Sequence, residues 1–207
     1  MGVNMAGNCI IDDEVCCKAS KQEIIRRYYQ ALCEKRRAGE TKKNISKLEN
    51  LMQQAQITVE DRKVIVEALK KEKETDGKPV VALELPNGKI VTGSTSDLLG
   101  AAAAALLNGI KVLGEIEDDV KLIAKEAIEP IQILKTNYLG SKNPRLHTDE
   151  ILIALSSTAA HNENAKKAMS QLHKLKGCDA HSTVLLSSVD ENVFKKLGIQ
   201  LTCEPKY

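Results

Sequence analysis

Aromatic side chains are scarce in this chain of 207 residues. They make up 2% of it, with no tryptophan and with Phe194 as the single phenylalanine. Aromatic ligand cages and sequence-tolerant nucleic-acid binding both depend on stacked rings. Charge offers no substitute, because 30 basic residues are balanced by 28 acidic ones for a net charge of +2. We therefore predict an aliphatic core and no nucleic-acid partner.

Long apolar runs are also missing. The longest, Leu98–Ile110, is rich in alanine and falls short of the roughly 20 residues that a bilayer-spanning helix requires. We therefore predict no membrane association. No signal-peptide pattern precedes the first cysteines, so we expect a cytoplasmic protein with reduced thiols.

The cysteines do not have the spacing of a metal site. No Cys-x-x-Cys pair occurs among the six, whereas structural zinc sites usually space their ligands by two to four residues. The phosphate-cradling pattern Gly-x-x-x-x-Gly-Lys-Ser/Thr is absent as well. We expect no metal site, and the cofactor, if there is one, stays unknown. The cysteines are Cys9, Cys16, Cys17, Cys33, Cys178 and Cys203.

The first part of the chain has a helical pattern. Apolar stripes recur at helical spacing over 20–39 and 41–54, and a third begins after Thr58. Lysine and arginine are interspersed with glutamate there, which favours solvated helix faces over a polyanion-binding surface. We predict a helical subdomain over 1–77.

From residue 78 onward, strand-like and helical segments alternate. An Asn-Gly pair at 87–88 separates two strand-like runs, which is a strong hairpin signal. The polar residues 94–97 are expected to cap a helix that reaches Leu113, and the five alanines in it would allow close packing. Further helices are predicted at 149–160, 164–174 and 190–197, with strands at 182–186 and 199–203. The prediction is an α+β or α/β fold, with a layered α/β subdomain over 78–207.

The hairpin followed by a small-residue helix is similar to the opening of the cytidine-deaminase-like scaffold. The zinc chemistry of that scaffold needs a His-x-Glu or Cys-x-Glu at the helix start and a later Pro-Cys-x-x-Cys. This chain has neither. The resemblance therefore implies the scaffold without its zinc ligands, and it argues against zinc-dependent deamination.

The stretch LGSKNPRLHTDEILIAL (139–155) concentrates polar residues just before an apolar helix. Asn143 precedes a proline and favours a turn, and Thr148 is a natural N-cap for a helix that begins with two acidic residues. Capping does not explain Arg145 and His147. One interpretation is an anion pocket formed by Asn143, Arg145 and Thr148, with His147 as an acid or base. The alternative is a surface loop whose charges pair with nearby carboxylates.

A second polar stretch, GCDAHS (177–182), precedes a predicted strand. Asp179, His181 and Ser182 have the chemistry of an acid, a base and a nucleophile, but they lie too close in sequence for an ordinary triad. His181 is a second candidate for proton transfer and Ser182 a further anion-binding candidate. Two alternatives remain open for His181. It could form a two-histidine metal site with His147, or its role could be purely structural.

Several longer strings resemble the bacterial family called domain of unknown function 1846, in the family's order along nearly the whole chain. Members of that family are cytoplasmic-type proteins, considerably longer than this chain, whose N-terminal part carries a glycine-rich loop. The resemblance is to the C-terminal part of the family, without that loop. The strings are MGVNMAG (1–7), SKQEIIRRYYQAL (20–32), ALELPNGKIVTG (82–93), PIQILKTNYLGSKNPRLHTDEILIAL (130–155) and LKGCDAHSTVLL (175–186).

The resemblance implies a structural or assembly module that works with an absent N-terminal part or with a second copy of itself. Its missing partner would leave apolar surface uncovered. The alternative is an anion-binding or phosphometabolite-binding part of an enzyme whose reaction is unknown. Without the glycine-rich loop, nucleotide-dependent hydrolysis is in doubt for this chain.

Overall fold

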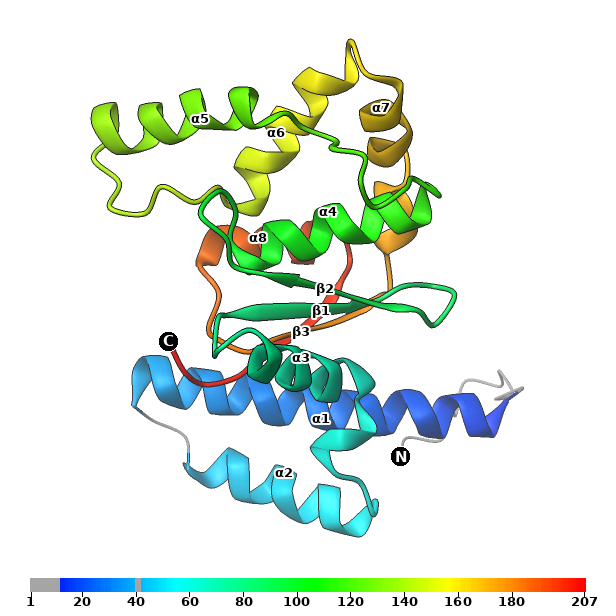
Figure 1. Cartoon of the computed structure of the whole chain (residues 1–207). Coiled ribbons are helices and arrows are strands. Elements are labelled where there is room, and N and C mark those ends of the chain that lie inside the picture. Colours follow the sequence, from blue (N-terminus) through cyan, green and yellow to red (C-terminus); the bar gives the residue numbers. More distant parts are fainter. Residues whose placement is uncertain (1–11, 40–41) are drawn as a thin grey trace. The chain divides into compact units, whose positions relative to one another are not determined.

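A computed structural model describes residues 12–39 and 42–207 of the chain (Figure 1). The chain divides into two compact units, Met1–Arg62 and Lys63–Tyr207. Cys9 and the string MGVNMAG lie outside the described residues. Within the described residues, no helix combines the length and the apolar character needed to cross a membrane.

The first unit is helical, as its apolar periodicity predicts. α1 (Asp13–Ala38) begins at Asp12, whose carboxylate accepts a hydrogen bond from the first turn, and it ends at Gly39. Gly39 has φ of 75°, a left-handed conformation that glycine adopts without steric cost. α2 (Lys42–Gln54) packs against α1, and the short 3₁₀ helix η1 (Val59–Asp61) follows it.

The second unit has a mixed α/β fold built on one four-stranded sheet, which confirms the predicted fold class. α3, predicted from sequence as part of the helical subdomain, belongs to this unit. The elements in chain order are α3 (Lys63–Glu74), β1 (Val80–Glu84), β2 (Ile90–Ser94), α4 (Ala101–Leu113), α5 (Lys125–Ile133), the π-helical turn η2 (Leu134–Tyr138), α6 (Thr148–Ala159), α7 (Glu163–Met169), the 3₁₀ helix η3 (Leu172–Leu175), β3 (Asp179–Ser182), α8 (Ser188–Lys196) and β4 (Gln200–Cys203).

The sheet has the strand order β2-β1-β3-β4. β1 and β2 form the predicted antiparallel hairpin, and Gly88 adopts φ of 79° at its turn. β3 pairs antiparallel with β1 and parallel with β4. The similarity to the cytidine-deaminase scaffold stays a prediction.

Alternation along the strands assigns each face of the sheet to a different helix. Ala82 packs with Val64 and Ala68 of α3, whereas the neighbouring Leu83 joins the main core on the side of α4. Figure 1 shows α3 and α4 on opposite sides of β1 and β2. A Cβ added to Gly93 of β2 would lie 2.1 Å from the backbone nitrogen of Ala105. The small residues in β2 and α4 therefore let the helix backbone contact the sheet directly.

Two predicted boundaries are wrong. α4 begins after its N-cap Gly100 and not at residues 94–97, because the Ser96 hydroxyl accepts hydrogen bonds from two nearby backbone N–H groups and closes a separate turn. β3 covers Asp179–Ser182 and not 182–186. The apolar run 184–186 leaves the sheet, and its chain becomes part of the pocket described next.

Candidate functional site

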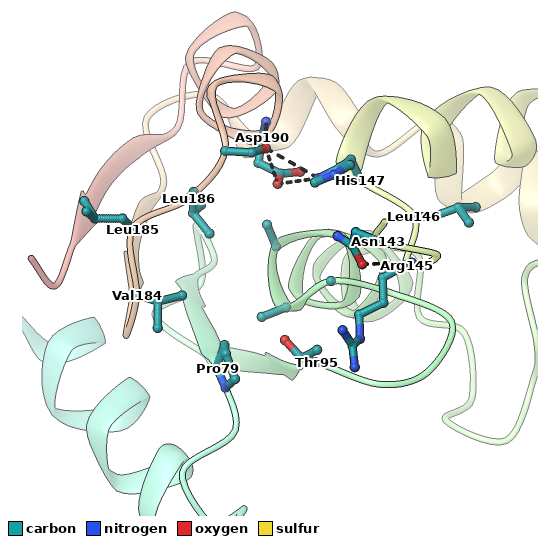
Figure 2. A pocket seen from close by; sticks show the side chains of 14 residues that line it. Pro79, Thr95, Asn143, Arg145, Leu146, His147, Val184, Leu185, Leu186 and Asp190 are labelled. Carbon is teal, nitrogen blue, oxygen red and sulfur yellow. Dashed lines mark hydrogen bonds and ion pairs between the residues drawn. The ribbon is translucent and has the colours of Figure 1, made fainter. Parts of the chain in front are cut away.

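A pocket of about 240 Å³ lies within the second unit. Its walls come from the first residues of α4, from the segment 143–147 that leads into α6, and from the segment 184–187 that leads into α8 (Figure 2). Figure 2 shows Val184, Leu186 and Pro79 across the pocket from Arg145 and Asn143. The pocket therefore has one apolar wall and one polar wall.

Leu146 anchors the polar wall to the body of the unit. Its N–H donates to the carbonyl of Leu98 at 2.9 Å, and its carbonyl accepts from the N–H of Gly100 at 3.1 Å. The Leu146 side chain is fully buried. Because neighbouring side chains of an extended segment point in opposite directions, Arg145 and His147 both line the pocket.

His147 and Asp190 form the principal polar pair of the pocket. Nδ1 of His147 lies 2.9 Å from Oδ2 of Asp190, although the two residues are far apart in sequence. The other carboxylate oxygen accepts from both the N–H and the hydroxyl of Thr148, each at 2.9 Å. The Ser187 hydroxyl donates to Oδ2 at 2.8 Å. Asp190 is thus a buried carboxylate whose two oxygens are both hydrogen-bonded.

This arrangement shifts both pKa values toward the ion pair. The hydrogen bond to Asp190 raises the pKa of His147 above its usual range, against the opposing effect of partial burial. Burial alone would raise the pKa of Asp190, but hydrogen bonds from His147, Thr148 and Ser187 outweigh burial and hold that pKa below its usual range. The imidazole is therefore a better base than a free histidine, and the carboxylate stays charged.

The geometry suits proton transfer through Nε2 of His147. Asp190 occupies Nδ1, and among the described residues Nε2 has no hydrogen-bond partner. Ser187 does not complete a nucleophilic triad, because its hydroxyl lies 3.4 Å from Nδ1 and bonds to the same carboxylate. A serine nucleophile would have to meet Nε2, the nitrogen opposite the aspartate.

Arg145 supplies the positive charge of the pocket. Its Nε donates to the carbonyl of Ser96 at 2.7 Å, and its backbone N–H donates to Oδ1 of Asn143 at 3.1 Å. These bonds fix the stem of the side chain, and Figure 2 shows the guanidinium beside Thr95. The two terminal nitrogens of the guanidinium, Nη1 and Nη2, make no hydrogen bond among the described residues.

The residues predicted from the stretch 139–155 come together at this pocket. Asn143, Arg145 and His147 line it, and Thr148 lies buried behind it as a donor to Asp190. His147 itself is the N-cap residue of α6, a place that the sequence analysis assigned to Thr148. Their predicted roles in binding and catalysis stay predictions.

The residues predicted from 177–182 lie elsewhere. His181 is fully buried in β3, opposite Ala82 on the α3 side of the sheet, and its Nδ1 lies 2.9 Å from Oγ1 of Thr202. The Ser182 hydroxyl donates to the carbonyl of Val184 at 2.7 Å. Neither residue lines the pocket. Over 12–39 and 42–207, no cluster of three or more His, Cys, Asp or Glu has the arrangement of a metal site.

The sequence analysis did not identify Asp190, and the signal available was weak. Ser187 and Asp190 form a Ser-x-x-Asp pattern, in which the Ser187 oxygen accepts from the N–H of Asp190 at the start of α8. That pattern predicts a helix N-terminus and nothing more. Only the fold brings the carboxylate to His147.

Comparison with known proteins matches nearly the whole chain to one protein family. The family description "Domain of unknown function DUF1846, C-terminal" matches residues 60–207, and "Domain of unknown function DUF1846, N-terminal" matches residues 1–56. The second match corrects the expectation that the chain resembles only the C-terminal part.

Three relatives show how far the similarity extends. UPF0371 proteins of Corynebacterium efficiens and Streptococcus thermophilus are each 53% identical over all 207 residues of this chain, which cover 42% of the relative. A UPF0371 protein of Corynebacterium urealyticum is 52% identical, with 41% of its length covered. The chain thus spans about two fifths of the length of the relatives it matches.

Proposed function

The chain belongs to the DUF1846 family, and we propose that its second unit carries an acid–base site for a small anionic substrate with an apolar portion. The observation that carries the proposal is the 2.9 Å contact between His147 and Asp190 in the wall of a pocket that Arg145 also lines. The family supplies no reaction to transfer, so the proposal rests on these side chains. A cytoplasmic setting is part of the same proposal.

His147 is the group that would move the proton. Asp190 holds Nδ1 in its protonated form, so Nε2 alternates between accepting and donating a proton. The ring is about one quarter exposed, at 28% of its side-chain surface, which leaves Nε2 within reach of a bound molecule. A buried carboxylate behind a reachable imidazole supports catalysis more than structural stabilisation.

Arg145 would hold the anionic group of the substrate. A guanidinium binds carboxylate or phosphate through paired N–H donors. α4 begins at the same pocket, and the positive end of its dipole adds to the attraction. The opposite wall is apolar and would accept a hydrocarbon portion. None of the described lining residues is a tryptophan, tyrosine or phenylalanine, which disfavours a nucleobase that needs a large ring as its stacking partner.

Arg145→Gln is expected to weaken anion binding by about tenfold or more, because a charge-assisted hydrogen bond is lost. The probes are inorganic phosphate and butylphosphonate, and the measurement is calorimetric titration of the 207-residue chain. We expect wild type to bind butylphosphonate more tightly than phosphate, since the butyl group removes apolar surface from water.

The matched control for that experiment is Lys142→Gln. Lys142 is an exposed cation immediately before the segment 143–147 and does not line the pocket. The Lys142→Gln variant should bind both probes with the same affinity as wild type. Equal affinity of Arg145→Gln and wild type for both anions would reject the anion site.

A second candidate function, an assembly module, is favoured by a different observation. The arm formed by α5, η2 and the C-cap residue Leu139 leaves several large apolar side chains exposed. Single exposed apolar residues are ordinary, but four within seven positions are a candidate for an interface. The partner would be a second copy of the chain, or a segment like those parts of the longer relatives that this chain does not cover. The side chains are Ile133, Leu134, Tyr138 and Leu139.

The double variant Leu134→Glu/Leu139→Glu is expected to remove concentration-dependent association. Charged groups on the arm would have to lose their hydration in an apolar contact. Sedimentation velocity of wild type should show a mass that rises with concentration, and the variant should sediment as a monomer. Met169→Glu, which changes an exposed methionine of α7, is the matched control. A wild-type chain that stays monomeric at all concentrations would exclude self-association through the arm.

A further inference from the structure

The π-helical turn η2 buries a lysine and exposes its apolar neighbours. Lys135 is 7% exposed, whereas Leu134 is 50% and Tyr138 is 78% exposed. Lysine is almost never buried without a partner, because taking its charge out of water is unfavourable. The buried ammonium of Lys135 therefore needs hydrogen-bond acceptors or a counter-charge nearby.

Those contacts hold two residues of the polar wall, Arg145 and His147. Nζ of Lys135 donates to the carbonyl of Arg145 at 2.6 Å and to Oε2 of Glu150 at 2.7 Å. The same Glu150 oxygen accepts the backbone N–H of His147 at 2.7 Å. One ammonium thus fixes the backbone of Arg145 directly and that of His147 through a single carboxylate.

The backbone of η2 has the wide turn that this contact uses. The N–H of Leu139 donates to the carbonyl of Leu134, five residues earlier, at 3.1 Å. The N–H of Ser141 donates to the carbonyl of Lys135 at 3.0 Å. Turns of this kind are rare and occur often at functional sites.

We infer that Lys135 is a positioning residue of the pocket, which holds Arg145 and His147 in the geometry that binds an anion and moves a proton. The inference rests on the proposed function of that pocket. Lys135 lies behind the polar wall and does not line the pocket. Its effect on a bound molecule passes through the backbone it holds and through its charge.

Its charge has an effect that packing alone would not produce. The groups that act on His147 are Asp190 of α8, Glu150 of α6 and Lys135 of η2. The hydrogen bond to Asp190 raises the pKa of His147 and burial lowers it; the charge of Lys135 lowers it and that of Glu150 raises it. Lys135→Met removes the cation and leaves Glu150 unpaired, so it should raise the pKa. Glu150→Gln should lower the pKa for the opposite reason.

The test is a pair of measurements on the full 207-residue chain. Proton NMR titration follows the imidazole signals, and His147→Gln identifies the signal of His147 by its loss. We expect a raised His147 pKa in Lys135→Met and a lowered one in Glu150→Gln. Calorimetry should show butylphosphonate binding about tenfold weaker in Lys135→Met, with recovery in Lys135→Arg. Lys125→Gln, which removes an exposed lysine of the same arm, is the control.

The outcomes separate this inference from the proposed function. An unchanged pKa and unchanged affinity in Lys135→Met overturn the positioning role. If that variant does not fold, Glu150→Gln decides the matter, and an unchanged or raised pKa overturns the inference. If wild type binds neither phosphate nor butylphosphonate, the proposed function fails and the binding role of Lys135 fails with it. The imidazole titration then still decides whether Lys135 controls the charge of His147.

Discussion

Asp190→Ala is expected to lower the free energy of unfolding by about 3 kcal/mol near neutral pH. The carboxylate accepts hydrogen bonds from His147, Thr148 and Ser187 while it is itself 7% exposed. Removal leaves the N–H and hydroxyl of Thr148 without their acceptor in a fully buried position. The same change should lower the pKa of His147, because it removes the group that raises that pKa most.

The pH dependence of that loss follows from the two shifted pKa values. The pKa of Asp190 is lowered from 3.8, so its contribution is present above that unfolded value and is lost as the pH falls through the folded one. The pKa of His147 is raised from 6.5, so its contribution is present below that value and is lost as the pH rises through the folded one. The stability difference between wild type and Asp190→Ala should therefore be largest between these two unfolded values.

Urea unfolding at about pH 3, 5.5 and 8.5 measures this difference below, within and above that window. Asp149→Ala is the matched control, because Asp149 lies in the first turn of α6 and accepts only from the adjacent Glu150 N–H in the described contacts. Its cost should stay within about 1 kcal/mol. A difference between wild type and Asp190→Ala that does not change with pH would contradict the ion pair.

Gly93→Ala is expected to destabilise the second unit by 3 kcal/mol or more, roughly the upper end of overpacking effects. The added Cβ would lie 2.1 Å from the nitrogen of Ala105 and 2.6 Å from the carbonyl carbon of Ala104. Both are backbone atoms of α4, and they cannot yield by a change of rotamer. The helix would have to move away from β2, and its contacts with the sheet would be lost.

Thermal and urea unfolding of the variant measure this effect, with Gly100→Ala as the control. Gly100 precedes the same helix, and its added Cβ would meet only the carbonyl oxygen of Leu146, at an ordinary 3.7 Å. Loss of a favourable N-cap residue should cost within about 1 kcal/mol there. Similar stability of Gly93→Ala and wild type would mean that α4 does not lie as close to β2 as the structure shows.

Local patterns predict much of this protein because they depend on near neighbours. The Asn-Gly hairpin requires only a turn that accepts positive φ at Gly88, and the structure confirms it. The polar residues 143–147 before an apolar helix indicated Arg145 and His147 as candidates, and the fold places both in one pocket. The position of β3 was predicted wrongly, because the polar residue His181 does not look like part of a buried strand. Thr202 of the neighbouring β4 supplies its hydrogen-bond partner, and only the fold brings the two together.

The sequence by itself determined the helical and strand periods, the hairpin, the aliphatic core and the unusual chemistry of Arg145 and His147. Tertiary structure alone decided which partners those side chains meet. Asp190 reaches His147 across 43 positions of chain, and Lys135 turns inward to Arg145 and Glu150 while its apolar neighbours face outward. Neither contact has a local signature, because burial of a charge becomes favourable only when distant segments bring its counter-charge and hydrogen bonds together.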